Sequence, residues 1–325
     1  MTPRAMWLLV LLVGFAGPSI ARAQDYPNRP VTLVVPYPAG GGLDVLARTL
    51  AQKLADRLGK PVVVDNRPGG GTVIGANSVA KAPPDGYTIM LGTSTPLAIA
   101  VSLHKSLPCD PARDFAPIVL TSNAPFMLLV NPALPVRSVS ELVNLVKEKP
   151  GELSYGSAGP GSPQHLSMEL LKSMTGINVV HVPYRGDAPA LSDLVAGHIP
   201  MMFGEPTPIL PLLREGRVRA IAVSSQTRLG PVPDIPTVAE SGVTGFHMVS
   251  WQMIVAPSAT PKEIVARLHS ELKSILTLPE IKKEFAETGR IGVDSPPPAE
   301  LLAFMQAEIV RLGKVVEAAG IAKSQ

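Results

Sequence analysis

Residues 31–64 read VTLVVPYPAGGGLDVLARTLAQKLADRLGKPVVV and contain the unit that recurs along the chain. The β-branched run at 31–35 predicts a strand. The leucines and alanines of 43–58 then recur at helical spacing until Gly59 ends the helix. A second apolar run at 61–64 predicts another strand. Strand, helix and strand in this order predict a parallel sheet covered by helices.

The same alternation continues to about residue 223. Ser138 and Glu141 have the spacing of a capping box, in which side chains satisfy free amides at the start of a helix. Gly176 and Gly197 end two of the helical runs. The expected strands cover 87–91, 126–130, 153–155, 178–182, 201–203 and 219–223. The expected helices cover 75–81, 163–174, 188–196 and 209–214.

The last third of the chain is mostly helical. We expect Thr260 to cap a helix that has Pro261 at its first position and continues to Leu276. A helix at 280–287, a strand at 291–293 and a terminal helix at 298–319 follow. These helices come with too few strands for a sheet of their own, so we expect them to pack on the first α/β unit.

Such a chain crosses twice between two domains. We expect the crossings near 119–125 and 245–252, with 24–120 and 250–325 forming one lobe and 121–249 the other. Two crossings form a hinge around a cleft, and clefts between domains are favoured ligand sites. The fold class is α/β, with a sheet flanked by helices in each lobe.

The composition fits a folded protein and excludes nucleic-acid binding. The chain is 46% hydrophobic and 17% charged, which is too apolar for a disordered protein. Its 325 residues are long enough for about two domains. Lys and Arg number 29 against 26 Asp and Glu, so the chain is close to neutral. A nucleic-acid surface needs clustered cations interleaved with aromatics, and the sequence has no basic run.

Residues 1–23 have the pattern of a secretory signal peptide. Arg4 precedes an apolar stretch at 6–15, and Ala21 and Ala23 are the small residues of a cleavage site. The apolar stretch is shorter than the roughly 20 residues that cross a bilayer. We therefore expect a soluble exported protein in the periplasm.

Two glycine-containing loops follow predicted strands and open helices. The first is Pro36 to Gly42 (PYPAGGG), with Asp44 in the first turn of the next helix, and the second is Gly156 to Ser162 (GSAGPGS). Glycine lets the backbone approach a ligand, and free amides at a helix start attract anions. If the loops face each other, they could hold an anion with a carboxylate at each end. The alternative is two ordinary strand-to-helix turns.

Signals for an enzyme are weak. The six histidines never pair at i, i+4, and Cys109 is the only cysteine, so we expect no metal, cofactor or disulfide. A secreted hydrolase that uses Ser157 or Ser162 with His165 remains an alternative, although Ser157 lacks the G-x-S-x-G spacing. His165 could be a general base, a hydrogen-bond donor to a ligand or a residue of the helix start.

Several short motifs follow one another in fixed order. They are Tyr26 to Val31 (YPNRPV), Val35 to Gly41 (VPYPAGG), Val64 to Gly71 (VDNRPGGG), Pro84 to Thr88 (PDGYT), Tyr155 to Ser157 (YGS), Val182 to Gly186 (VPYRG) and Pro236 to Gly242 (PTVAESG). In this order the chain resembles the Bug family of periplasmic solute receptors, over essentially all of its length after the leader.

The resemblance implies a two-lobed Venus flytrap fold, similar to type II binding proteins. It implies a receptor that captures a small di- or tricarboxylate, or a related organic acid, for the membrane subunits of a tripartite tricarboxylate transporter. The acid would be held by backbone amides and ordered waters of the two loops. The binding residues that it implies are Pro38, Ala39, Gly40, Gly41, Ser157, Gly161, Ser162 and His165, assisted by Thr93 and Ser94.

Two acidic residues, Asp44 and Glu205, complete the candidate ligand-binding set. Many relatives have an aspartate after the strand that ends at Phe203, whereas this chain has Gly204 and Glu205, so the resemblance leaves the particular acid open. We expect a monomer without catalytic residues. A ligand sensor that docks on a receptor kinase is a further alternative.

Overall fold

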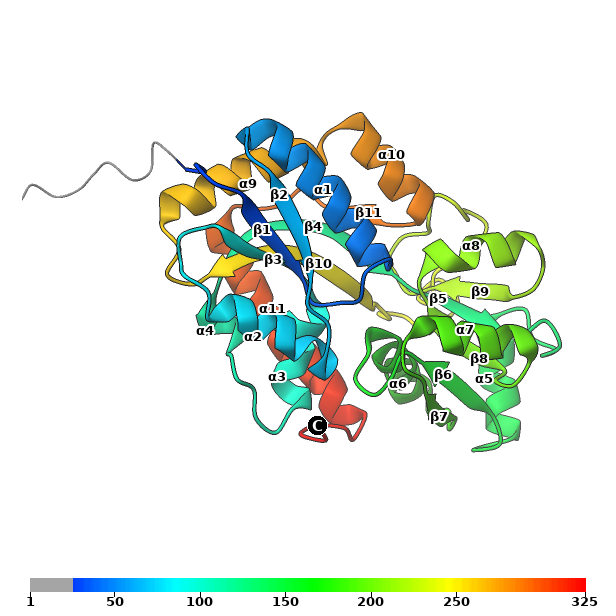
Figure 1. Cartoon of the computed structure of the whole chain (residues 1–325). Coiled ribbons are helices and arrows are strands. Elements are labelled where there is room, and N and C mark those ends of the chain that lie inside the picture. Colours follow the sequence, from blue (N-terminus) through cyan, green and yellow to red (C-terminus); the bar gives the residue numbers. More distant parts are fainter. Residues whose placement is uncertain (1–25) are drawn as a thin grey trace, which may run out of the picture.

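The computed structural model describes residues 26–325 and contains two sheets, each flanked by helices (Figure 1). The predicted signal peptide at 1–23 lies outside the described residues. In Figure 1 the elements of the second sheet, in green, form a separate lobe to the right of the larger first lobe. The predicted α/β class, with a flanked sheet in each lobe, is confirmed.

The first sheet has the strand order β11-β4-β10-β3-β1-β2. β1 runs parallel to β2 and β3, but β10 runs antiparallel to both β3 and β4. The expectation of purely parallel sheets is therefore wrong: β4 leads out toward the second sheet and β10 returns from it, so the two run in opposite directions. The strands are β1 Val31–Val35, β2 Val62–Asn66, β3 Thr88–Thr93, β4 Phe115–Pro125, β10 Val249–Pro257 and β11 Ile291–Gly292.

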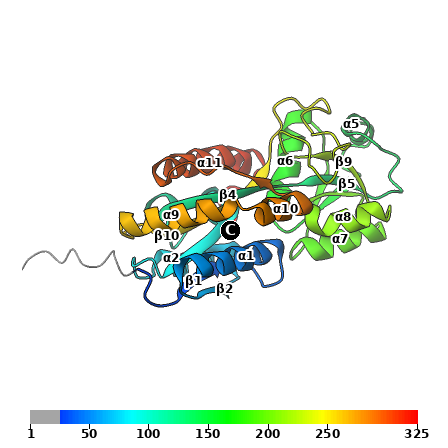
Figure 2. The same cartoon turned by 90° about the horizontal axis from the view of Figure 1, so that it is seen from above.

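Helices cover both faces of the first sheet. Along β1, Leu33 and Val35 join one apolar cluster with α1 and α9, and Val34 joins another with α2 and α11. Figure 2 shows α11 and α1 on opposite sides of β4. The C-terminal helices thus pack on the first α/β unit, as the sequence predicts. The helices of this lobe are α1 Gly42–Leu58, α2 Val73–Ala80, α3 Ala100–Leu103, α4 Pro111–Asp114, α9 Lys262–Leu276, α10 Pro279–Thr288 and α11 Pro298–Ala318.

The second sheet has the order β7-β6-β8-β5-β9. β6 is parallel to β7 and β8, whereas β5 is antiparallel to β8 and β9. The strands are β5 Met127–Val130, β6 Ser154–Ser157, β7 Val180–Pro183, β8 Met201–Gly204 and β9 Arg219–Val223. The helices are α5 Val139–Glu148, α6 Pro163–Thr175, α7 Asp187–Ala196 and α8 Pro206–Arg214.

Two predicted helix starts have different outcomes. Ser138 Oγ accepts from the Glu141 amide at 3.2 Å, so this side chain caps α5 as expected. Thr260 does not cap α9: the carbonyl of Pro261 accepts from the amides of Ile264 and Val265, so α9 begins one residue later and Pro261 stands outside it.

Long strands occupy most of the two segments in which we expect the crossings. β4 continues to Pro125 and β10 begins at Val249, and these two end residues are paired in the first sheet. Trp251 of β10 is 1% exposed and donates through Nε1 to Glu308 of α11 at 2.8 Å. This side chain thus fixes α11 on the sheet rather than lining a cleft.

Ser224 ties the two chain crossings together. Its Oγ accepts from the Phe126 amide at 2.8 Å, between β4 and β5, and donates to the Met248 carbonyl at 2.5 Å, just before β10. The side chain is fully buried. Because both crossings share this serine, the lobes are joined at a short, hydrogen-bonded hinge.

Among residues 26–325, no helix combines the length and apolarity that a membrane crossing requires.

We predict that Ser224→Ala lowers the free energy of unfolding by about 2 kcal/mol, because the buried Phe126 amide loses its acceptor. Urea unfolding of the mature protein measures the change. Ser192→Ala is the matched control, since Ser192 Oγ bonds only the Ala188 carbonyl within its own helix on an exposed face. A Ser224→Ala protein as stable as this control would contradict the role of the hinge serine.

Candidate functional site

The first loop projects from the first lobe between β1 and α1. Pro38, Ala39, Gly40 and Gly41 are exposed, and Gly40 has a φ of +84° that a side chain would strain. No side chain within the described residues caps the start of α1 at Gly41. Apart from the Gly40 amide, which donates to Asp44, the amide groups of this loop are therefore available to an anionic group.

Asp44 holds the first loop in place from inside the lobe. It is 3% exposed, and its carboxylate accepts from the Gly40 amide at 2.8 Å, Arg48 Nε at 3.0 Å and Asn66 Nδ2 at 3.0 Å. Burial opposes ionisation, but these hydrogen bonds outweigh it and lower the pKa of Asp44. We expect Asp44 to position the loop rather than touch a ligand.

Thr93 and Ser94 lie at the end of β3, beside Tyr37 of the first loop. Thr93 Oγ1 is 2.8 Å from the Tyr37 hydroxyl and accepts from the Thr95 amide at 3.2 Å, where a π-helical turn begins. Burial raises the pKa of Tyr37, the hydrogen bond with Thr93 lowers it, and the carboxyls of Glu205 and Asp187 raise it. Acidic groups of the second lobe thus act on a side chain of the first loop.

The second loop, which belongs to the second lobe, packs against the first lobe. A Cβ on Gly161 would lie 2.3 Å from Leu103 of α3, and the Pro160 carbonyl accepts from Gln325 Nε2 at 3.2 Å. Gly161 has a φ of +75° and no room for a side chain, so only glycine permits this contact. The loop therefore forms part of the surface between the lobes.

The polar side chains of the second loop are engaged within their own lobe. Ser157 is fully buried and lies 2.6 Å from His181 Nε2, and its Oγ accepts from the Gly159 amide at 3.1 Å. Ser162 caps α6 by accepting from the His165 amide at 3.2 Å. What these residues offer toward the space between the lobes is mainly backbone.

His165 is the acceptor that fixes the second loop. Its Nδ1 accepts from the Gly161 amide at 3.0 Å, so the ring is neutral with its proton on Nε2. The ring stacks on His181 with centroids 3.9 Å apart. Burial, followed by the neighbouring His181, lowers the pKa of His165 to about 4. Of the three roles that the sequence left open, this geometry supports a residue of the helix start.

The pairing that the hydrolase alternative requires is not formed between these residues. Ser157 meets His181 rather than His165, and Ser162 contacts only the backbone amide of His165. A nucleophile must be within reach of its base and open to substrate. Ser157 is fully buried, so its hydroxyl does not meet the second condition.

Two residues near the cleft, Gln164 and Asp187, were missed by the sequence analysis. Gln164 Nε2, in the first turn of α6, donates to Oδ2 of Asp187 at 2.7 Å, where α7 begins. Burial raises the pKa of Asp187 to about 7, and Glu205 adds to this shift. Asp187 directly follows the glycine of the Val182 to Gly186 motif, which was the one available signal in the sequence.

Glu205 and Arg290 bring the two lobes together on the hinge side. Arg290 donates to the carbonyl of Gly42 at 2.8 Å and to Gln252 Oε1 at 2.9 Å, and Glu205 Oε2 lies 3.5 Å from where a Cβ on Gly42 would stand. Burial raises the pKa of Glu205, and the Arg290 cation opposes the shift. No motif pointed to Arg290, because only the fold returns β11 to this edge of the sheet.

The two lobes thus meet at two places, one at each predicted loop. The first loop meets Glu205, and the second loop meets α3. A small cavity beside Glu205 and Arg290 lies at this interface. A larger one, of about 520 Å³, lies elsewhere on the second lobe, between β9 and residues 231–235. Neither predicted loop lines that larger cavity, so we place the candidate site between the lobes.

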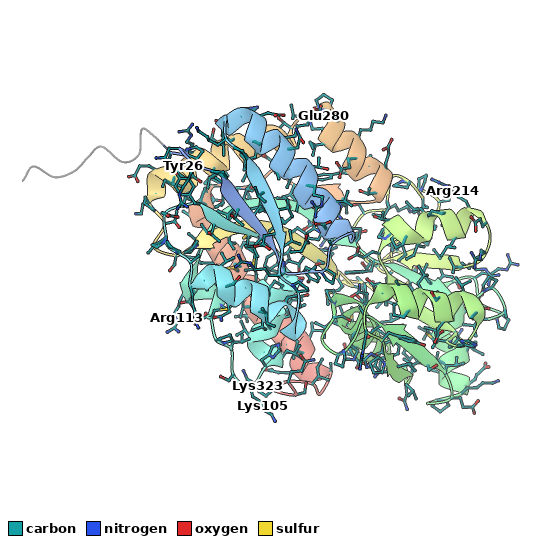
Figure 3. All side chains as sticks on the ribbon, in the orientation of Figure 1. Tyr26, Lys105, Arg113, Arg214, Glu280 and Lys323 are labelled. Carbon is teal, nitrogen blue, oxygen red and sulfur yellow. The ribbon has the colours of Figure 1, made fainter. Side chains whose placement is uncertain are left out.

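Figure 3 shows that Lys105, Arg113 and Glu280 lie on the outside of the first lobe.

Two lobes joined by two crossings, with polar loops facing the space between them, define a solute-binding protein. The family model described as tripartite tricarboxylate transporter family receptor (TctC) matches residues 46–321. The chain belongs to this family. It is also similar to protein BugT of Bordetella pertussis, with 36% identity over 314 residues, 96% of this chain and 95% of that protein. The resemblance to the Bug family is therefore confirmed.

Solved structures of similar proteins have the same two-lobed fold. A protein from R. palustris with adipate is 39% identical, with a TM-score of 0.84 over 92% of this chain and 99% of that one. The periplasmic binding protein BugD is 34% identical, with a TM-score of 0.80 over 91% and 99%. MatC from Rhodopseudomonas palustris with bound malate is 34% identical, with a TM-score of 0.79 over 90% and 100%.

We predict that this protein loses stability as the pH is lowered, and that part of this loss comes from His165. Its lowered folded-state pKa means that the unfolded chain binds the extra proton, so stability is complete above about pH 6.5 and is lost toward pH 4. Between pH 7.5 and pH 5 the loss from this ring is roughly 2 kcal/mol. In His165→Asn, an amide oxygen replaces Nδ1 without titrating, so urea unfolding should show a pH-dependent loss smaller by that amount.

His198→Asn is the control for this measurement, because the His198 side chain is 70% exposed on the same lobe. It should keep the wild-type difference between the two pH values. If His165→Asn loses as much stability as the wild type, the buried ring is not the source of the effect.

Proposed function

We propose that this protein is an extracytoplasmic solute-binding receptor that captures a small organic carboxylate between its lobes. The observation that carries the proposal is the exposed first loop, which opens α1 without a side-chain cap and whose shape is fixed by the buried Asp44 carboxylate. A carboxylate accepts well from such amides, because hydrogen bonds to an ionised group are stronger than neutral ones. Similar proteins hold adipate and malate, which supports an acid as the ligand.

The ligand-binding set follows from the two loops. Backbone groups of Pro38, Ala39, Gly40 and Gly41 would face the acid from the first lobe, next to Thr93 and Ser94. Gly161 and the start of α6 would face it from the second lobe. Ser157, Ser162 and His165 would support this surface, since their side chains are engaged inside the lobe.

The same proposal includes a cellular compartment and a partner for the protein. The predicted signal peptide would direct the chain to the periplasm, and the lobes would close on the acid as 24–120 with 250–325 against 121–249. The closed shape would then be recognised by the membrane subunits of a tripartite tricarboxylate transporter. Closure excludes water, which strengthens the hydrogen bonds between amides and carboxylate. The protein would act as a monomer and without catalysis.

We predict that Gly41→Val abolishes ligand-induced thermal stabilisation but leaves the fold intact. Gly41 has an ordinary φ of −79°, and the nearest atom to an added Cβ is 3.9 Å away, so valine fits without strain. Its branched side chain would cover the loop amides. Thermal unfolding of the mature protein with a panel of C4 to C6 carboxylates, adipate and malate included, provides the measurement.

Gly230→Val is the matched control, since a Cβ on Gly230 meets nothing within 4 Å and this exposed residue of the second lobe lies outside both loops. It should be stabilised by the same acids as the wild type. Equal stabilisation of Gly41→Val would remove the first loop from the site, and a wild-type protein that no acid of the panel stabilises would overturn the proposed function.

A further inference from the structure

Three acceptor side chains of the second lobe stand at helix starts, and the carboxyls of two of them act on Tyr37 of the first loop. Gln164 lies in the first turn of α6, Asp187 begins α7 and Glu205 directly precedes α8. Gln164 and Asp187 are joined by a hydrogen bond of 2.7 Å, and Glu205 reaches the start of α1 at Gly42. On the first lobe, the first loop opens α1 without a side-chain cap and so offers amide donors, and the two sides of the cleft differ in polarity.

Two of these acceptors are buried without a partner. Gln164 Oε1 and Asp187 Oδ1 have no hydrogen-bond partner within residues 26–325, and Gln164 as a whole is only 4% exposed. A buried acceptor left unpaired costs free energy, so such groups are usually paired by protein, water or ligand. The amide nitrogen of Gln164 already serves Asp187, so the free oxygens call for a donor from outside the lobe.

The charges of the cleft point the same way. The Arg290 cation acts on Glu205, but its two terminal nitrogens donate to Gly42 and Gln252 within the first lobe. A dicarboxylate between the lobes would add two negative charges beside Asp187 and Glu205. Like charges brought together away from water repel strongly. A ligand with a positive end on this side would relieve both the repulsion and the unpaired acceptors.

We propose that this cleft selects an amino acid or another aminocarboxylate, with its carboxylate on the first-loop amides and its ammonium group on Gln164, Asp187 and Glu205. An ammonium group has three N–H donors and no acceptor, which matches three acceptor side chains. This inference rests on the proposed function and narrows its ligand class.

Matched pairs of acids that differ at one end test the proposal. Titration calorimetry of the mature protein compares adipate with 6-aminohexanoate and succinate with 4-aminobutanoate. A third pair compares malate with aspartate, in which an amino group replaces the hydroxyl group. In at least one pair we expect the acid with the amino group to bind about tenfold more tightly than its partner. One charge-assisted hydrogen bond predicts a difference of this size. If the dicarboxylate binds as tightly or more tightly in every pair, the proposed function stands and this inference is wrong.

Variants separate an acceptor role from a donor role of the two carboxyl groups. Asp187→Asn and Glu205→Gln keep the shape and add N–H donors. If the carboxylates hold an ammonium group, each variant weakens aminocarboxylate binding by about tenfold and shifts the preference toward the dicarboxylate. If protonated carboxyl groups instead donate to a ligand carboxylate, both variants keep tight dicarboxylate binding, which would overturn the proposal.

Glu215→Gln is the control, because it makes the same change at the other, exposed end of α8. It should keep the wild-type preference within each pair. Thermal unfolding without ligand checks that each variant folds, and the wild-type preference decides the question even if one variant does not. Absence of binding by every acid would overturn the inference and the proposed function together.

Discussion

Two chain crossings that share one buried serine impose the arrangement on which the site depends. Because Ser224 bonds the backbone at Phe126 and at Met248, the two crossings are held side by side where they leave the second sheet. The carboxyl ends of β1 and β6 lead into the two loops. Loops at strand ends are where ligands bind in open α/β folds, and here two sets of strand ends meet.

Buried groups that never touch a ligand shape the surface that would. Asp44 lies inside the first lobe and fixes Gly40, while His165 lies inside the second and fixes Gly161. Each uses a side-chain acceptor to hold one glycine amide. The loops are thereby fixed before a ligand arrives, which reduces the ordering cost of binding.

The space between the lobes is not a uniform anion site. The first lobe contributes amides and Arg290, and the second contributes Asp187 and Glu205, whose carboxyls act on Tyr37. Helix starts and acidic side chains coexist there, so the local field differs from one end of the cleft to the other. A net charge near zero for the whole chain conceals this asymmetry.

The sequence by itself determined the alternating strands and helices, the glycine loops between them and the family. These features are local: apolar spacing, capping residues such as Ser138 and short motifs such as YPNRPV act over a few residues. Asp44, Ser162 and His165 could be named because they lie within or beside the loops. Their roles as supports could not, because the roles depend on which neighbouring atom each side chain reaches.

Only the tertiary structure decided the direction of β10, the shared bonds of Ser224 and the meeting of Gln164, Asp187, Glu205 and Arg290. Arg290 lies 85 residues after Glu205 and 248 after Gly42, whose carbonyl it binds. Such long-range contacts are set by how the lobes fold back on each other, and no local spacing encodes them. The loops and Glu205 were therefore visible in the sequence, but Asp187 and Arg290 were not.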